Sequence, residues 1–151
     1  MNKKDIQVIK ETTTQLLQVL GISPDFDVVE SGEGVEIVLQ TEENGMLIGY
    51  HGETLEALQL VISLAVAKAL GNYVRVSLEV GEYKKNRMEY LENLVRETKE
   101  RVLADGNAVS LPNLKSWERR YVHMLLQEDT EVMTESTGEG RDRVLTIYPK
   151  Q

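Results

Sequence analysis

The sequence contains no cysteine among its 151 residues. Disulfide bonds and thiolate metal sites are therefore excluded. The richest apolar stretch, LQLVISLAVAKAL, is shorter than the roughly 18 apolar residues that indicate a membrane span. The first ten residues, MNKKDIQVIK, lack the apolar core of a secretory signal. We therefore expect a cytoplasmic protein without a transmembrane segment.

Positive charge is scarce in the first half of the chain. Residues 1–80 carry 5 Lys/Arg and 12 Asp/Glu, whereas residues 81–151 carry 12 and 13, and the whole chain has a net charge of −8. Nucleic-acid-binding modules usually show a basic surface. A surface that faces phosphates is therefore predicted in the second half, or must use backbone amides in the first.

Groups that could support catalysis are also few. The sequence has only two histidines, and no acidic cluster surrounds them at the spacing of metal ligands. No Ser-His-Asp or Cys-His arrangement is visible. We expect a protein that is not an enzyme and that binds no metal or cofactor.

Residues 1–81 are predicted to form one α+β unit. Apolar spacing indicates a helix that stops at Gly21, followed by two strands around the turn at residues 31–34. A short helix, a glycine corner, a helix that ends near Gly71 and a strand at 73–80 follow. This order predicts a three-stranded sheet with helices on one face.

The helix after the glycine corner is apolar on more than one side. Leu55, Leu58 and Ile62 lie on one stripe, and Leu60 and Leu64 lie on another. A helix that is apolar all round is typical of a buried position. The pattern therefore predicts that this helix is buried.

Residues 82–151 are predicted to form a second unit of the type αβαββ. A charged amphipathic helix comes first, and then the short apolar strand AVSL. NLKSWERRYVHMLLQ has helical spacing, with an apolar face formed by Trp117, Tyr121, Met124 and Leu125. The segments TEVMTES and RDRVLTIYP are expected to form a hairpin.

The corner Gly49-x-x-Gly52 lies between two predicted helices. Glycine-rich backbone at a helix start exposes N–H groups, and the helix dipole adds positive potential. In KH domains such a loop clamps single-stranded nucleic acid. A helix-turn-helix corner whose glycines only relieve strain explains the pattern equally simply. The motifs of dinucleotide-binding and P-loop folds are absent.

Arg119 and His123 lie four residues apart on the predicted helix in the second unit. This spacing places both side chains on one side, opposite the expected apolar face. Both residue types contact phosphates. The alternative is a polar outer face without a ligand.

Three stretches together resemble one family: LIGYHGETLEALQLVISLAVAK, YVRVSLEVGEYKKNR and WERRYVHMLLQ with VMTESTGEGRDRVLTIYPK. In this order and spacing they are similar to the Jag family, the bacterial SpoIIIJ-associated proteins. The resemblance implies a type II KH domain at 1–81 and a domain named for its Arg-x-x-x-His motif (R-three-H) at 82–151. It further implies a cytoplasmic protein that binds single-stranded RNA, or DNA, without catalysis. Family members are linked to post-transcriptional control of cell elongation and division, and to the membrane-protein insertase.

The resemblance also assigns roles to residues. Gly49 and Gly52 would form the clamp, and its groove would be shaped by Ile48, Tyr50, His51 and Leu55. Arg119 and His123 would form the paired polar face of the second domain, with Arg141 and Arg143 as neighbours on the hairpin by their charge. Because the two residues between the glycines are aromatic, stacking and backbone contacts are expected to dominate. A rival hypothesis is an adaptor that uses the KH scaffold to bind a protein, such as a second KH protein.

Overall fold

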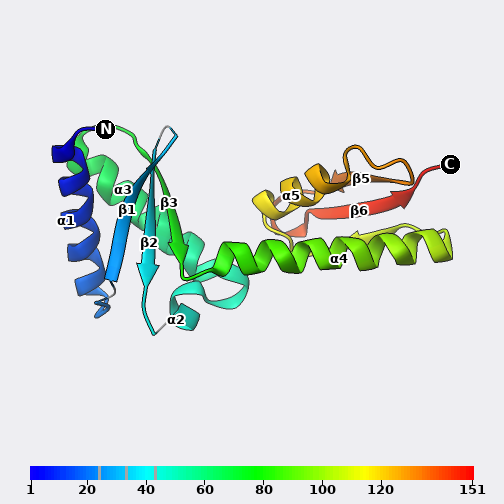
Figure 1. The fold of residues 1–151 in the computed structure, drawn as a ribbon, viewed down its shortest axis with the longest axis horizontal. Coiled ribbons are helices and arrows are strands. Elements are labelled where there is room, and N and C mark those ends of the chain that lie inside the picture. Colours follow the sequence, from blue (N-terminus) through cyan, green and yellow to red (C-terminus); the bar gives the residue numbers. More distant parts are fainter. Residues whose placement is uncertain (24, 33, 43) are drawn as a thin grey trace. The chain divides into compact units, whose positions relative to one another are not determined.

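A computed structural model describes residues 1–23, 25–32, 34–42 and 44–151. The chain divides into two compact units, residues 1–84 and 85–151. Each unit has its own sheet and its own hydrophobic core (Figure 1).

Unit 1 contains a three-stranded sheet in the order β1-β2-β3, in which β1 and β2 are antiparallel and β2 and β3 are parallel. The predicted order of helices and strands in this unit is confirmed. The predicted turn at 31–34 includes Glu33, which lies outside the described residues. The elements are α1 (Lys3–Val19), β1 (Asp25–Ser31), β2 (Gly34–Gln40), α2 (Asn44–Ile48), the 3-10 turn η1 (Tyr50–Gly52), α3 (Glu53–Leu70) and β3 (Arg75–Val80).

Local sequence signals explain both ends of α1. The side chain of Asn2 accepts a hydrogen bond from the Asp5 amide at 2.8 Å, and the Asp5 carboxylate accepts one from the Asn2 amide. This reciprocal cap satisfies two amide groups at the helix start. At the other end Gly21 adopts a φ of 73°, and its N–H donates to the carbonyl of Gln18. The helix stop that Gly21 predicts is confirmed.

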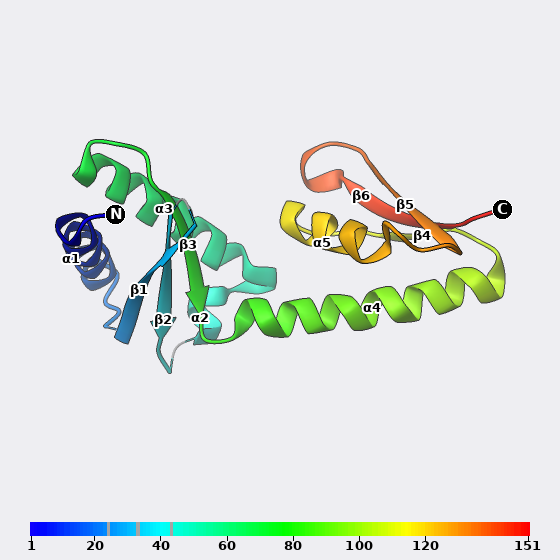
Figure 2. The same cartoon turned by 45° about the horizontal axis from the view of Figure 1, so that its top comes forward.

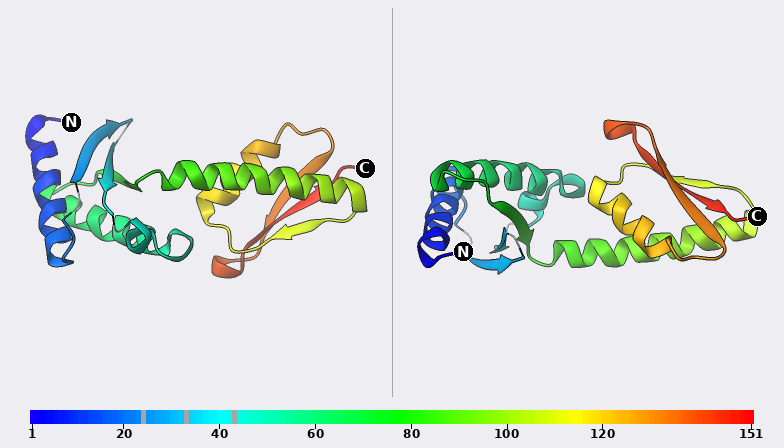
Figure 3. Two further views of the ribbon diagram at one scale, coloured as in Figure 1. Left: turned by 60° about the horizontal axis from the view of Figure 1, so that its bottom comes forward. Right: turned by 90° about the horizontal axis from the view of Figure 1, so that it is seen from above.

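The core of unit 1 lies between the sheet and two helices. Val35, Ile37 and Leu39 alternate along β2 and are buried, as their period of two predicts. Their side chains pack with those of Ile9 and Leu17 from α1. Both α1 and α3 lie on the same face of the sheet (Figures 1 and 3).

The prediction that α3 is buried on more than one side is wrong. The side chains of its core-facing row are buried, but Leu60 and Leu64 are 60% and 64% exposed. Val61 beside them is also exposed. Because α1 and the sheet cover only one side of α3, its second apolar stripe has no partner within the described part of unit 1. The buried row consists of Leu55, Leu58, Ile62 and Val66.

Unit 2 contains an antiparallel sheet in the order β4-β6-β5, and the predicted αβαββ order is confirmed. Figure 2 shows α5 packed along this sheet. The elements are α4 (Tyr83–Asp105, which begins at the end of unit 1), β4 (Val109–Leu111), α5 (Ser116–Leu126), β5 (Val132–Thr137), the 3-10 turn η2 (Gly140–Asp142) and β6 (Val144–Pro149).

The apolar face predicted for α5 is confirmed for Trp117 and Tyr121, which pack against the core of unit 2, and wrong for the other two residues. Met124 and Leu125 are exposed, whereas Val122 and Leu126 are buried together with Glu118. The sequence misleads here because a carboxylate occupies a core position. Glu118 is buried because it pairs with Arg87 of α4, a relationship that helical periodicity does not contain.

Candidate nucleic-acid interface

The glycine corner of unit 1 has an unusual backbone. Gly49 has φ 69° and ψ −170°, a conformation that is essentially restricted to glycine. His51 and Gly52 follow with φ of 50° and 76°, both in the left-handed region. Three of four consecutive residues therefore have a positive φ, which makes the abrupt turn from α2 into α3.

Internal packing also requires the two glycines. A Cβ atom at Gly49 would overlap the side chain of Thr54 in the first turn of α3. A Cβ atom at Gly52 would lie 2.8 Å from the hydroxyl oxygen of Tyr83. Close packing within unit 1 is therefore sufficient to explain both glycines, so their presence alone does not identify a ligand.

The start of α3 carries acidic side chains. Gly52 is its N-terminal capping residue, and no side chain caps the helix there. Glu53 and Glu56 lie in the first turn. Carboxylates at this position offset the positive end of the helix dipole. The corner therefore offers a weaker anion site than a neutral helix start would.

The two residues between the glycines present aromatic rings to solvent. The Tyr50 side chain is 76% exposed, and His51 is exposed beside it. Their ring centroids lie 4.0 Å apart at an interplanar angle of 67°. Ile48 is half-buried and Leu55 is only 5% exposed, and both pack into the core of unit 1. The accessible part of the predicted groove is therefore the ring pair.

The paired side chains of α5 are each held by a neighbouring group. Arg119 donates from Nη1 to the Leu114 carbonyl at 2.5 Å and from Nη2 to the Ser116 hydroxyl at 3.1 Å. His123 Nδ1 lies 2.7 Å from the Thr134 hydroxyl on β5. Arg119 is half-buried and His123 is exposed. Both residues come from the same side of α5, as their spacing predicts.

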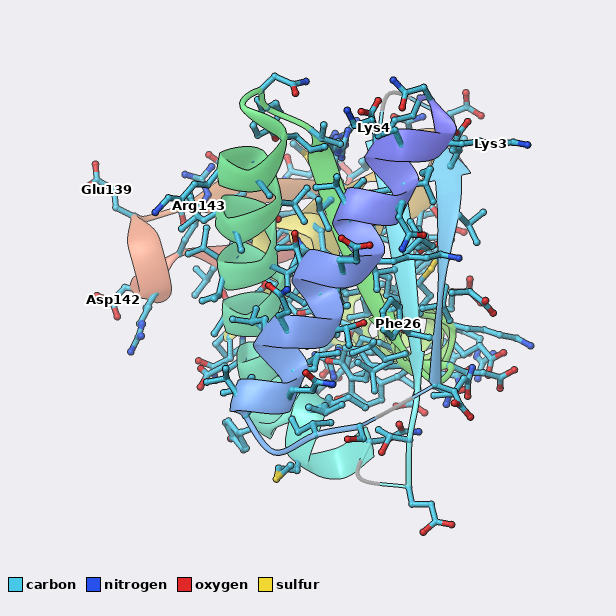
Figure 4. The ribbon with its side chains drawn as sticks, turned by 90° about the vertical axis from the view of Figure 1, so that its left-hand side faces the viewer. Lys3, Lys4, Phe26, Glu139, Asp142 and Arg143 are labelled. Carbon is cyan, nitrogen blue, oxygen red and sulfur yellow. The ribbon has the colours of Figure 1, made fainter. Side chains whose placement is uncertain are left out.

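The two hairpin arginines differ in their surroundings. Arg143 donates from Nε to the Ser136 hydroxyl at 2.8 Å and from Nη1 to the Gly138 carbonyl at 3.1 Å. These bonds close the turn between β5 and β6, where Figure 4 labels Arg143 with Glu139 and Asp142. Arg141 is exposed in η2. Arg143 therefore holds the turn, and Arg141 is the more accessible cation.

Sequence reasoning missed the hydroxyl groups that position these side chains. Ser116, Thr134 and Ser136 each lie within hydrogen-bond distance of a predicted site residue. For Ser116 the signal was available, because it lies three residues before Arg119 on the same helix. Thr134 and Ser136 meet their partners only through the packing of α5 on β5 and the turn after β5.

In the part of the chain that the structure describes, each helix is too short or insufficiently apolar to cross a membrane. A sheet with antiparallel and parallel pairs, together with a glycine corner between α2 and α3, is the architecture of a KH domain. The αβαββ unit with Arg119 and His123 follows it. A sequence model described as KhpA/KhpB, KH domain matches residues 7–79, and the model of the R-three-H domain matches residues 89–149.

Three curated relatives carry the name RNA-binding protein KhpB. The protein from Clostridium symbiosum is 32% identical over all of this chain and 67% of its own length. The Bacillus subtilis protein is 30% identical over 97% of this chain and 71% of its own length. The Lactiplantibacillus plantarum protein is 28% identical over 97% of this chain but only 45% of its own length. The chain therefore belongs to the KhpB (Jag) family.

Proposed function

We propose that this chain binds single-stranded RNA and acts without catalysing a reaction. Relatives that match 97% or more of this chain are named RNA-binding proteins, and its two units match sequence models of a KH domain and an R-three-H domain. The observation that carries the proposal is the exposed Tyr50–His51 ring pair on a corner whose backbone is fixed by internal packing.

At the KH corner, recognition is proposed to rest on stacking. Every base has a π-face, so aromatic platforms bind single strands with little sequence preference. The corner is held by the packing of Gly49 and Gly52, which limits the entropy lost when a strand binds. Because Glu53 and Glu56 oppose phosphate, we expect a small electrostatic contribution from this unit.

In unit 2, we propose that Arg119 and His123 contact a phosphate group, with Arg141 as a further cation. The guanidinium of Arg119 has five N–H donors, and two hydrogen bonds anchor it. We propose that its other N–H groups, for which no bond to a described residue is seen, meet an anion. Two weak modules on one chain bind a long strand more tightly than either does alone.

The cellular role follows only from family membership. We propose post-transcriptional regulation in the cytoplasm, linked to cell elongation and division, with single-stranded DNA as a second ligand. Proximity to the membrane-protein insertase also remains a proposal. The division into domains at Gly81, which lies close to the boundary between the compact units, is proposed on the same basis.

Fluorescence anisotropy of a labelled mixed-sequence single-stranded RNA tests the function. The variant Tyr50→Ala/His51→Asn removes the ring pair, and Asn tolerates the left-handed conformation at position 51. Loss of one stacked base costs about 1–3 kcal/mol, so affinity should fall at least ~5-fold. Tyr73→Ala is the matched control, since Tyr73 is an 81% exposed tyrosine in the same unit. Substitution of the glycines is unsuitable because it disturbs packing.

Salt dependence tests the contribution of unit 2. Each phosphate contact to a single strand adds about 0.7 to the slope of log affinity against log salt. Arg119→Ala should reduce this slope by about that amount, whereas Arg120→Ala, at the exposed neighbouring arginine, should not. Absence of wild-type binding at low salt would disprove RNA binding by this chain.

A protein-binding adaptor is a second candidate, favoured by the exposed apolar stripe of α3. Leu60, Val61 and Leu64 are all exposed, and Leu60 and Leu64 lie about one turn apart on α3. Exposed apolar patches of this kind mark interaction sites in soluble proteins. We propose a KH-domain protein, or a second copy of this chain, as the partner.

Sedimentation analysis tests the adaptor hypothesis. If the stripe is an interface with a second copy, the wild type should sediment above the monomer mass and Leu60→Glu/Leu64→Glu should sediment as a monomer. Leu103→Glu, at an exposed leucine of unit 2, is the control. For a different KH protein, the same variants are compared in a binding titration with that protein. Equal behaviour of wild type and the double variant in both assays contradicts the hypothesis.

A further inference from the structure

The exposed ring of His123 is anchored to strand β5. Its Nδ1 atom lies 2.7 Å from the hydroxyl oxygen of Thr134. The second ring nitrogen, Nε2, makes no hydrogen bond to any residue that the structure describes. One nitrogen is therefore tied to the protein, and the other remains available for a ligand.

Thr134 reaches α5 because of strand alternation. Val132, Thr134 and Ser136 point to the face of β5 that packs on α5, and Val132 is fully buried in the core. Glu135 points to the opposite face and is exposed. The hydroxyl of Thr134 is thus held next to the last turn of α5, and the neighbouring carboxylate is directed away from His123.

The hydroxyl of Thr134 can serve the imidazole as a donor or as an acceptor. A neutral ring that accepts the Thr134 proton at Nδ1 must carry its own hydrogen at Nε2. A charged ring donates from both nitrogens, and the hydroxyl then accepts. A neutral ring can also donate from Nδ1 to the hydroxyl, and Nε2 is then an acceptor. Two of these three states present at Nε2 the N–H donor that a phosphate oxygen requires.

We propose that Thr134 is a positioning residue for nucleic-acid binding, which holds His123 so that Nε2–H is directed to a phosphate. The proposal rests on the function proposed for Arg119 and His123. Thr134 acts only through His123 and does not contact the strand. Arg119 is anchored in the same way by Ser116 and the Leu114 carbonyl, so both members of the pair are oriented before a ligand arrives.

The first experiment needs no RNA. In the whole chain labelled with ¹⁵N, the histidine ring nitrogen shifts report which nitrogen is protonated. In the wild type the neutral His123 ring should carry its proton at Nε2. Thr134→Val, which keeps the shape but removes the hydroxyl, should move the ring toward a mixture of tautomers. Thr134→Ser, which restores a hydroxyl, should return the wild-type shifts. Unchanged shifts in Thr134→Val would overturn the proposal.

The second experiment is a double-mutant cycle with the labelled mixed-sequence RNA. Thr134→Val should weaken binding by about 2- to 10-fold, which corresponds to one hydrogen bond. In a His123→Ala background the same substitution should have no further effect. Thr137→Val, on the opposite face of β5, should leave affinity unchanged and is the control. Equal losses in both backgrounds would show that Thr134 acts independently of His123, which contradicts the proposal.

The two experiments distinguish failure of the proposed phosphate contact of His123 from failure of the proposed positioning role of Thr134. If the ring shifts respond to Thr134→Val but His123→Ala leaves RNA affinity unchanged, the phosphate contact of His123 is wrong and the function of Thr134 falls with it. If His123→Ala weakens binding but Thr134→Val changes neither shifts nor affinity, the contact stands and only the positioning role is overturned.

Discussion

Arg87 of α4 and Glu118 of α5 form an ion pair in the core of unit 2, with Nε of Arg87 2.5 Å from Oε1 of Glu118. The Glu118 side chain is 1% exposed, and its Oε2 atom also accepts the amide hydrogen of Lys115 at 2.9 Å. The same carboxylate therefore caps α5 and joins it to α4. The Arg87 guanidinium in addition lies 4.7 Å from the centroid of the Tyr90 ring.

Removal of Arg87 should strongly destabilise unit 2. Arg87→Met leaves the Glu118 carboxylate buried without its cation, and breaking such a pair costs about 3–5 kcal/mol. Urea unfolding followed by the fluorescence of Trp117, the single tryptophan of the chain, reports on unit 2. Arg96→Met changes an exposed arginine of α4 and should cost less than ~0.5 kcal/mol. Similar losses for both variants would contradict a structural role for the pair.

Unit 2 should lose stability at acidic pH because Asp129 becomes protonated. The hydrogen bond from Lys99, at 2.6 Å, and two backbone amides lower the pKa of Asp129 from its ordinary value of 3.8. A carboxylate with a lowered folded-state pKa contributes stability above pH 3.8, and this contribution is lost as pH falls through the folded-state pKa. The urea concentration at which half of the wild type is unfolded should therefore decrease when the pH is lowered below about 4.

The same bond raises the pKa of Lys99 above its ordinary value of 10.5. A raised folded-state pKa contributes stability that is complete below pH 10.5 and is lost as pH rises through the folded-state value. Asp129→Asn should weaken the pH dependence of stability in both the acidic and the alkaline range. The substitution removes the charge but keeps an oxygen that can accept from the backbone amides. Glu128→Gln, at the exposed neighbouring carboxylate, should retain the wild-type dependence. Identical pH profiles for Asp129→Asn and wild type would refute the assignment.

Gly49→Ala should destabilise unit 1 more than Gly71→Ala. Both glycines have a positive φ, of 69° and 75°, but a Cβ atom at Gly71 meets no atom within 4 Å. The Gly71 variant therefore carries backbone strain of about 1 kcal/mol, and the Gly49 variant adds the overlap with Thr54. Hydrogen exchange of the β2 and β3 amides measures the loss, with β6 of unit 2 as the internal reference. Equal losses would argue against the packing explanation of the corner.

A side chain of α3 accepts a hydrogen bond from the edge strand β3. The Leu78 amide donates to Oε1 of Gln59 at 2.9 Å. Gln59→Ala leaves this amide without its acceptor, which should cost about 1–2 kcal/mol in hydrogen-exchange protection of β3. Lys68→Ala, at an exposed position of the same helix, should have little effect. Full protection of Leu78 in Gln59→Ala would show that the bond is not needed.

Local sequence patterns predict helix ends and core-facing residues correctly where a single residue or a short period determines them. Gly21 ends α1, and the alternation of Val35, Ile37 and Leu39 places one face of β2 in the core. The spacing of Arg119 and His123 also indicated their common side of α5. These features depend on φ preferences and on helical or strand periods, which are properties of short segments.

Two errors arose where partners lie far apart in the chain. The apolar stripe with Leu60 and Leu64 predicts burial, but burial requires a covering element, and the described part of unit 1 supplies none. Met124 and Leu125 are predicted on the core face of α5, but Glu118 takes a core position instead, because Arg87, 31 residues earlier, neutralises its charge there. The periodicity of a sequence shows which residues share a face of a helix or strand, but it does not show which element packs against that face.

The sequence by itself determined the order of the elements, the family and the identity of the candidate site residues, because motifs and periods are local. Only the tertiary structure decided which of those residues are accessible. Leu55 is in the core, Arg143 closes a turn, and Tyr50 with His51 remains exposed on a corner fixed by Thr54 and Tyr83. Thr134 acquires its place beside His123 only when β5 packs on α5, since hydrogen bonds between distant segments form only in the folded chain.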